Sequence, residues 1–202
     1  MLRLRSLRLQ HVQHAGRDAL RRLCREGTCR HIGAGARAHG GGTSAESATV
    51  RCVSADLSAI GLAVGHATDE RGATGLTIVR GERAPFRCSA AVIGRATGTR
   101  ELHAASPYHL VDRVDAVVLT GGSAYGLDAT AGAMQWMEER GRGYRVGAGV
   151  VPIIPAAVIF DLAPLGSPTA RPTPAMAYDA CESASATNIA EGSVGAGTGA
   201  TV

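Results

Sequence analysis

The chain has 202 residues, of which 45% are hydrophobic and 19% charged, and its formal net charge is +4. This hydrophobic content is sufficient for one substantial core. The longest nearly apolar stretch, residues 146–160, is too short to span a bilayer and contains Pro152 and Pro155. No basic stripe interleaved with aromatics, as a nucleic-acid surface would need, is present. We therefore expect neither a membrane nor a nucleic acid as a partner.

The charge is distributed unevenly and divides the chain into two parts. Residues 1–50 carry nine Arg against three acidic residues, whereas residues 51–202 are net negative. The run at residues 33–42 is rich in glycine, as linkers are, and no apolar block typical of a secretory signal precedes it. We predict that residues 1–54 are a disordered leader, a targeting segment or the result of a start codon assigned too early. The folded domain is then residues 55–202.

The cysteines indicate a reducing compartment. There are five of them, an odd number with no paired framework, which favours free thiols in a cytoplasmic protein. Cys24, Cys29 and His31 have a spacing found in zinc sites, but no second ligand pair completes a tetrahedral set. We expect no metal and no other cofactor.

The predicted elements of the domain begin with strands. Residues 60–64 and 74–79 are predicted strands, with the segment GHATDERG forming a turn between them. Residues 114–120 form a continuous β-branched run typical of a buried strand. A further strand region is expected within residues 146–160.

Two helices are predicted to alternate with these strands. The first covers residues 123–140, begins with Ser123 as its cap, and is expected to bury one face. That face comprises Ala124, Leu127, Ala131 and Met134. The second is predicted at residues 173–190, where Thr173 is the N-cap and Pro174 lies in the first turn. This alternation predicts an α/β or α+β fold.

Four segments in a fixed order resemble one enzyme family. They are GLAVGHATDERGATGLTIV, VVLTGGSAYGLDATAGAMQWMEERG, VVPIIPAAVIFDL and EGSVGAGTGATV. Together they resemble the L-aminopeptidase/D-esterase (DmpA-type) family, which includes β-peptidyl aminopeptidases and nylon-oligomer hydrolases. The similarity covers residues 57–202.

The resemblance implies a fold and an activity. The fold would be α+β, a four-layer αββα sandwich of which these residues form the front part. The family's precursor cuts itself once, and the new N-terminal Ser or Thr becomes a nucleophile that can use its own amine as base. The resemblance places this residue beyond Val202, so the isolated chain is expected to be inactive. The complete protein would release N-terminal residues from short peptides, amides or esters, as a homo-oligomer that includes the C-terminal fragment.

The resemblance also implies site residues. Tyr125 occupies the position of an active-site tyrosine, which would hydrogen-bond near the reacting carbonyl or the nucleophile; the alternative is a core tyrosine whose hydroxyl bonds to backbone. Ser193 stands where many members have Asn, an oxyanion-hole donor, but it could instead be a turn residue that caps the preceding helix. Gly195, Gly197 and Gly199 are interpreted as the loop that lines the substrate cleft.

Other interpretations remain open. The chain could be a truncated, non-catalytic remnant or a structural partner. A nucleotide site at the glycine-rich loop is disfavoured, because a dinucleotide fingerprint directly follows a strand and opens a helix. We expect His66 to be a turn residue with its ring bonded to backbone, and not a general base. Asp161 is expected to cap a backbone group or to pair with an arginine.

Overall fold

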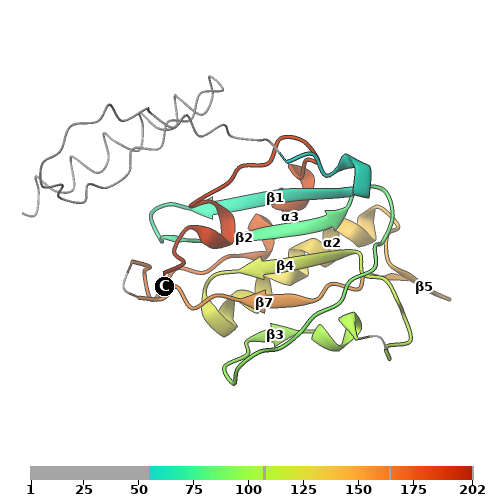
Figure 1. Cartoon of the computed structure of the whole chain (residues 1–202), viewed down its shortest axis with the longest axis horizontal. Coiled ribbons are helices and arrows are strands. Elements are labelled where there is room, and N and C mark those ends of the chain that lie inside the picture. The colour runs from blue at the N-terminus through green and yellow to red at the C-terminus, as the bar shows by residue number, and fades with distance from the viewer. Residues whose placement is uncertain (1–54, 107, 164, 202) are drawn as a thin grey trace, which may run out of the picture. The chain divides into compact units, whose positions relative to one another are not determined.

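The fold is built on a five-stranded mixed sheet (Figure 1). The computed structural model describes residues 55–106, 108–163 and 165–201, so the predicted leader, residues 1–54, lies outside the described residues. The strands in spatial order are β1 (Leu62–Asp69), β2 (Thr74–Gly81), β4 (Ala116–Thr120), β7 (Ala156–Val158) and β3 (Thr99–Arg100). β4 and β7 are parallel, and the other neighbours are antiparallel.

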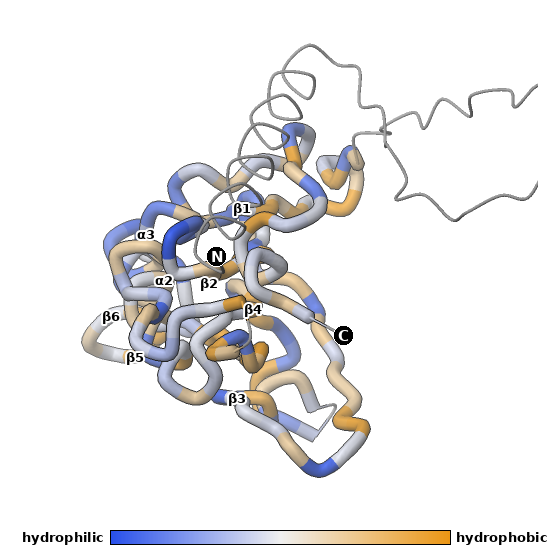
Figure 2. Tube along the Cα trace, turned by 90° about the vertical axis from the view of Figure 1, so that its left-hand side faces the viewer, coloured by the Kyte–Doolittle hydropathy of each residue, from blue (hydrophilic) through white to orange (hydrophobic). Residues whose placement is uncertain are grey.

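Two α-helices form a layer against this sheet. They are α2 (Thr130–Glu139) and α3 (Pro174–Glu182), and both lie on the same side of the sheet in the turned view of Figure 2. The remaining elements are η1 (Ser58–Ile60), η2 (Leu102–Ala105), η3 (Ser123–Ala129), η4 (Gly195–Gly197) and the hairpin of β5 (Tyr144–Val146) with β6 (Gly149–Val151). The α+β class is confirmed, with one helical layer and one sheet layer. Within the described residues, no helix has the length and apolar character needed to cross a membrane.

The strand predictions for β2 and β4 are confirmed, but the first strand is longer than predicted. β1 continues to Asp69 and pairs His66 with Thr77, so five of the eight residues of the predicted turn, 65–69, are strand. Gly65 is not a turn residue either. A Cβ at Gly65 would collide with the carbonyl of Ala180, so this glycine lets α3 approach the strand closely. The predicted strand region at 146–160 divides into β5, β6 and β7.

The predicted start of the first helix is wrong, and its predicted buried face is confirmed only in part: Leu127 and Met134 pack against the core, whereas Ala124 and Ala131 do not. Ser123 does not cap it, because Gly122 occupies the cap position and Ser123 itself has a φ of 53°. The first seven residues form the 3₁₀ segment η3, whose three residues per turn change the phase of everything that follows. Ala124 and Ala131 are therefore exposed. The buried side comprises Ala129, Ala133, Trp136 and Met137.

The second helix begins as predicted and ends earlier. The Thr173 hydroxyl accepts a hydrogen bond from the Met176 amide at 3.3 Å, and Pro174 is the first helical residue. The helix stops at Glu182 because the chain turns back to the sheet edge. There, Ser185 exchanges two backbone hydrogen bonds with Val64, at 2.9 and 3.0 Å.

The core lies between the sheet and the two helices. Leu76, Ile78 and Val118 from the sheet contact a helical surface that is made largely of small side chains. That surface includes Ala129, Ala133, Ala177 and Ala180. At Gly132, a Cβ would overlap the backbone of Pro174, so α2 and α3 meet with their backbones in close contact.

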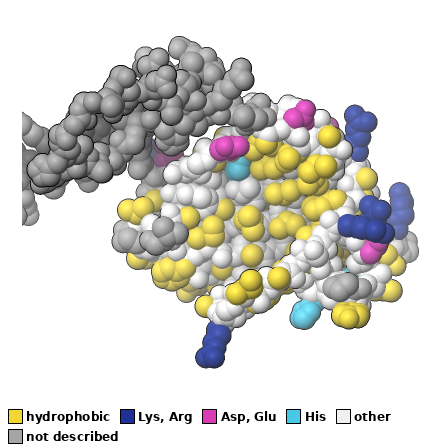
Figure 3. Space-filling view, in the orientation of Figure 1, with side chains coloured by type: hydrophobic (Ala, Val, Ile, Leu, Met, Phe, Trp, Pro, Cys, Tyr) yellow, Lys and Arg dark blue, Asp and Glu magenta, His cyan; other side chains and the backbone are white. Residues whose placement is uncertain are grey.

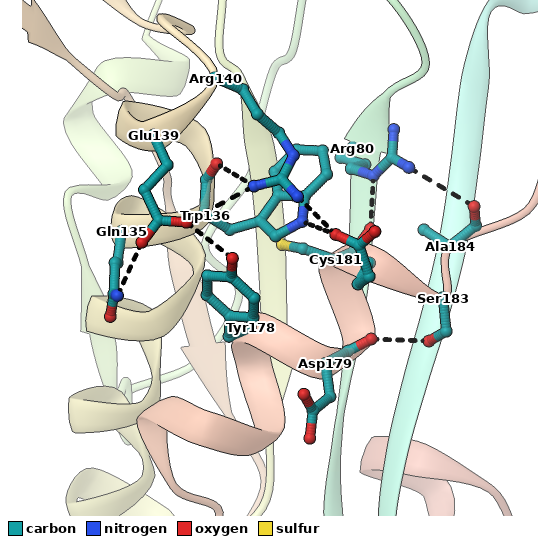
Figure 4. Close-up of polar contacts among 11 residues, drawn as sticks. Arg80, Gln135, Trp136, Glu139, Arg140, Tyr178, Asp179, Cys181, Ser183 and Ala184 are labelled. Atoms are coloured by element: carbon teal, nitrogen blue, oxygen red, sulfur yellow. Dashed lines mark hydrogen bonds and ion pairs between the residues drawn. The ribbon is translucent and has the colours of Figure 1, made fainter.

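A polar cluster closes one end of the helical layer (Figure 4). The Trp136 ring lies between the guanidinium groups of Arg80 and Arg140, at 4.7 and 4.2 Å from its centroid. Its Nε1 donates to Glu182 at 2.6 Å, and Arg140 pairs with the same carboxylate. The bonds of Trp136 and Arg140 to Glu182 fix α2 to α3, and Arg80 links β2 to α3 through the Cys181 carbonyl at 3.0 Å, so the cluster has a structural role.

The second face of the sheet carries apolar side chains, and neither α2 nor α3 covers it. Of the described helical segments, the short η4 packs on this face, beside Thr77 and His66. Successive side chains of a strand point to opposite faces, so the neighbours of buried Leu76, Ile78 and Val118 face away from the helices. Figure 3 shows apolar side chains gathered on the side of the molecule that faces the viewer. Leu119 on this face is 41% exposed, whereas Leu76 on the helical face is fully buried.

The two faces predict different costs for the same substitution. Leu76→Ala should lower the free energy of unfolding by about 2–5 kcal/mol, because it leaves a cavity in a packed core. Leu119→Ala should lower it by about 1 kcal/mol or less, because that side chain remains partly in water. Urea unfolding of the 202-residue chain measures both. Equal losses would show that the outer face is packed as tightly as the inner one.

Candidate active site

The candidate site lies at the edge of the sheet where β4 and β7 end. These neighbouring parallel strands end at the same edge, which is where open sheets commonly bind ligands. The start of β2 reaches the same edge, because the Gly121 amide donates to the Gly75 carbonyl at 2.8 Å. The end of the described chain also lies here, marked C in Figure 1. The predicted site residues Tyr125 and Gly199 both lie near this edge.

A buried carboxylate ties these segments together. Asp161 is 1% exposed and follows β7. Its Oδ2 accepts a hydrogen bond from the Thr74 hydroxyl, and its Oδ1 accepts one from the Gly122 amide, both at 2.6 Å. The prediction that Asp161 caps a backbone group is confirmed, since Gly122 is the cap position of η3. Among the described residues, it forms no ion pair with an arginine.

The turn after β4 has a conformation that few sequences allow. Gly122 and Ser123 have φ values of 79° and 53°, two successive left-handed residues. A Cβ at Gly121 would collide with Asp161 and Thr74, so that position requires glycine. The Ser123 amide donates to Ile159 at 3.1 Å, which fixes the turn to the segment after β7. The turn therefore places η3, and Tyr125 on it, at the sheet edge.

Tyr125 is exposed and free at its hydroxyl. Its side chain is 66% exposed, which excludes the alternative of a core tyrosine. The Arg171 guanidinium lies 4.4 Å from its ring centroid. Within the described residues, the hydroxyl forms no hydrogen bond. Tyr125 is thus positioned to contact a ligand, and its catalytic role stays a prediction.

The glycine-rich loop packs on the β1–β2 hairpin. The Gly195 amide donates to the Thr68 hydroxyl at 2.8 Å, and the Ala196 amide donates to the Thr77 hydroxyl at 3.1 Å. Gly195 has a φ of 55° and lies so close to Thr77 that a Cβ would collide with it. Further along, a Cβ on Gly199 would lie 3.0 Å from the Asp161 side chain. The end of the loop therefore packs close to Asp161, the residue that also binds the Tyr125 turn.

Gly197 and Ser193 make looser contacts. Gly197 is half-buried and donates its amide to Val194 at 3.0 Å within the 3₁₀ turn. Ser193 is exposed, and in the described residues its side chain contacts neither Tyr125 nor the turn that carries it. The preceding helix ends at Glu182, so Ser193 does not cap it. Its role as an oxyanion donor stays a prediction.

His66 supports the loop through Thr77. We had predicted that it lies in a turn, and this prediction is wrong. It lies in β1, and its Nδ1 is 2.9 Å from the Thr77 hydroxyl. Its Nε2 is buried and faces the backbone of Ala190 without a well-aligned hydrogen bond. Burial lowers the pKa of the ring below 6.5, and the Ala190 backbone offsets only part of this effect. A neutral ring can accept the Thr77 O–H, whose oxygen accepts the Ala196 amide.

Some of these residues could not be identified from the sequence. Arg171 and Thr74 are separated from Tyr125 and Asp161 by long stretches of chain, and neither belongs to a motif that predicts its contact. A threonine hydroxyl that accepts a loop amide likewise leaves no local pattern. Among the described residues, no group of three or more His, Cys, Asp or Glu side chains is placed to hold a metal ion.

Solved structures share this fold. The described fold is similar to the L-aminopeptidase D-Ala-esterase/amidase of Ochrobactrum anthropi, a variant of the Ntn-hydrolase fold, with a TM-score of 0.56 and 19% identity over 69% of this chain and 42% of that chain. It is also similar to a protein of Pyrococcus horikoshii OT3, with a TM-score of 0.56 and 20% identity over 70% of this chain and 43% of that one. At these identities the similarity establishes the fold alone.

Sequence comparison gives the family. The family described as Peptidase family S58 matches residues 55–202, and the chain belongs to this family. An uncharacterized aminopeptidase of Mycobacterium tuberculosis (strain H37Rv) is 51% identical over 104 residues, which are 52% of this chain and 30% of that protein. One of Mycobacterium leprae (strain TN) is 48% identical over 114 residues, 53% of this chain and 31% of that protein. The chain thus spans about a third of the length of these relatives.

The Asp161 contacts predict a graded loss of stability. Asp161→Ala leaves the Gly122 amide and the Thr74 hydroxyl buried without a partner, and should cost about 2–5 kcal/mol. Asp161→Asn should cost less, because its amide oxygen still accepts from Gly122. The exposed Asp128 provides the control, and Asp128→Ala should change stability by about 0.5 kcal/mol or less. Urea unfolding measures all three, and an Ala variant at position 161 as stable as the wild type would contradict this assignment.

His66 predicts a dependence on pH. Its folded-state pKa lies below that of the unfolded chain, so its contribution to stability is complete above about pH 6.5 and is lost as the pH falls through the folded-state value. Stability of the wild type relative to His66→Gln should therefore decrease on acidification. Unfolding curves across this range measure the difference, and NMR titration should give His66 a pKa below 6.5. A relative gain on acidification would exclude the neutral anchor.

Proposed function

We propose that this chain forms the substrate-binding part of an autoprocessing N-terminal-nucleophile hydrolase that releases N-terminal residues from short peptides, amides or esters. The observation that carries the proposal is the Tyr125 hydroxyl, which has no hydrogen bond within the described residues and lies at the sheet edge where Asp161 binds Gly122 and where Gly199 of the glycine-rich loop packs close to Asp161. Membership of peptidase family S58 and relatives named aminopeptidases support the reaction class. We also place the enzyme in the cytoplasm, because Cys88 and Cys181 are free thiols.

The proposed chemistry needs a nucleophile and hydrogen-bond donors. The nucleophile's hydroxyl oxygen attacks the substrate carbonyl, and its proton passes through a base to the leaving amine or alcohol as the C–N or C–O bond breaks. Water then hydrolyses the acyl-enzyme ester, which releases the acid and restores the hydroxyl. Donors placed at the developing oxyanion stabilise that step, and loss of one commonly costs about 10²–10³ in rate. In this proposal, Tyr125 and Ser193 supply hydroxyl donors from this chain.

The nucleophile in this proposal comes from outside these residues. Self-cleavage beyond residue 202 would create an N-terminal Ser or Thr on a second fragment. The apolar outer face of the sheet supports this arrangement, because a second sheet packed on it would complete the αββα layers. That fragment would then face the glycine-rich loop, and the complete enzyme would assemble as a homo-oligomer.

Hydrolysis of aminoacyl p-nitroanilides tests the function. The protein expressed from its complete gene should cleave itself once and then release p-nitroaniline, whereas an N-acetylated substrate should remain intact. Residues 1–202 expressed alone should show neither turnover nor self-cleavage. Turnover by that chain after repurification would show that it contains the nucleophile. Inactivity of the complete protein would favour a non-catalytic structural chain.

The same assay tests Tyr125. Tyr125→Phe removes only the hydroxyl and should reduce the rate about 10- to 1000-fold with folding preserved. Tyr178→Phe is the matched control, because the Tyr178 hydroxyl already donates to Glu139 at 2.6 Å in the helical layer. Ser193→Asn should maintain or raise activity if Ser193 occupies the oxyanion position. Full activity of Tyr125→Phe would remove Tyr125 from the mechanism.

A further inference from the structure

In the described residues, one charged side chain lies over the Tyr125 ring. Among the described residues, the ring's only aromatic or charged partner is the Arg171 guanidinium, at 4.4 Å from the centroid. The ring is otherwise 66% exposed. An exposed tyrosine ordinarily samples several rotamers within nanoseconds. A side chain that limits these rotamers therefore determines where the hydroxyl lies.

Arg171 is itself fixed before it reaches the ring. Its Nη1 donates to the Ala170 carbonyl at 2.7 Å, and its Nη2 donates to the Pro168 carbonyl at 2.6 Å. A planar guanidinium held through two nitrogens has one orientation. The segment that carries it is also fixed, because the Ser167 amide donates to Gly72 at 2.9 Å and Thr173 caps α3.

The same segment touches the turn that begins η3. A Cβ on Gly122 would lie 3.0 Å from the Pro172 ring and 3.4 Å from the Arg171 Cδ. The aliphatic part of Arg171 thus lies beside the turn, and its guanidinium lies over the Tyr125 ring. The turn and the ring are therefore positioned by one residue on a third segment.

A comparison with the other arginine–aromatic contacts shows what differs here. Arg140 stacks over Trp136 at 4.2 Å and Tyr178 at 5.9 Å, but both rings also hydrogen-bond to carboxylates. Those contacts link helices. At Tyr125 the cation orders the ring while the hydroxyl stays unpaired in the described structure. The attraction between the cation and the π-electrons of the ring favours the ring position that lies beneath the guanidinium.

We propose that Arg171 is a positioning residue for Tyr125, which orients the phenol so that its hydroxyl meets the reacting group of the substrate. This inference rests on the proposed role of Tyr125 in catalysis. Arg171 does not touch the substrate. It acts through the ring, so its effect requires the Tyr125 hydroxyl.

A double-mutant cycle in the protein expressed from its complete gene tests this. Arg171→Gln should lower kcat about 2- to 30-fold, the range that corresponds to a cation–π contact, with KM changed less than about 2-fold. In the Tyr125→Phe background the same substitution should change kcat less than about 2-fold, because no hydroxyl remains to be oriented. Arg171→Lys keeps a cation without the planar fork and should recover part of the rate.

Arg140→Gln is the matched control. It removes the arginine from the helical cluster, and its effect on kcat should be the same in both backgrounds. If Arg171→Gln does not fold, as judged by its melting curve, Arg171→Lys carries the cycle, with a partial loss expected only when Tyr125 is present. Equal losses in both backgrounds would overturn the inference and leave Arg171 a structural loop residue. Unchanged kcat in Tyr125→Phe alone would overturn the catalytic role of Tyr125, whereas a loss there without coupling would overturn only the role of Arg171.

Discussion

The Asp161 carboxylate is the constraint on which the sheet edge depends. Transfer of a carboxylate from water to a protein interior costs several kcal/mol unless hydrogen bonds compensate for it. Asp161 is 1% exposed and is compensated by two short bonds, one from Thr74 and one from the Gly122 amide. Because these partners come from separate segments, the carboxylate keeps both hydrogen bonds only while the β2 end, the Gly122 turn and the segment after β7 stay together.

This requirement explains the glycines around it. Side chains at Gly121, Gly166 or Gly199 would occupy space taken by Asp161 or by the backbone of Ala73. Close approach of the backbones brings the end of the loop and the Tyr125 turn together at Asp161, without an ion pair among the described residues. The geometry of the candidate site therefore depends on the two hydrogen bonds that compensate for the burial of the Asp161 carboxylate.

Local patterns predicted part of this structure. The strands β2 and β4 follow from β-branched runs, and the start of α3 follows from Thr173 and Pro174, because each of these signals lies within a few residues. The extension of β1 through Gly65 was not predictable, since it depends on pairing with β2 and on α3 behind it. The buried face of the first helical region was predicted only in part, because the sequence does not show that η3 is 3₁₀.

The site divides in the same way. Tyr125 and the loop glycines were found through resemblance to a family, whereas Asp161, Thr74 and Arg171 act through contacts between distant segments.

The hydrogen bonds that the loop amides already make limit which groups of the loop can bind a ligand. The amides of Gly195 and Ala196 are taken by threonine hydroxyls. The amides of Gly197 and Thr198 close the 3₁₀ turn.

Since each amide has one N–H, these four donors are unavailable to an oxyanion unless the loop leaves the hairpin. In the described residues, the hydroxyls of Tyr125 and Ser193 have no such commitment. These two hydroxyls are therefore better placed than the four loop amides to bind an oxyanion while the loop keeps its hydrogen bonds. The two threonine hydroxyls hold Gly195 and Ala196 on the hairpin, just as Asp161 holds the turn that carries Tyr125.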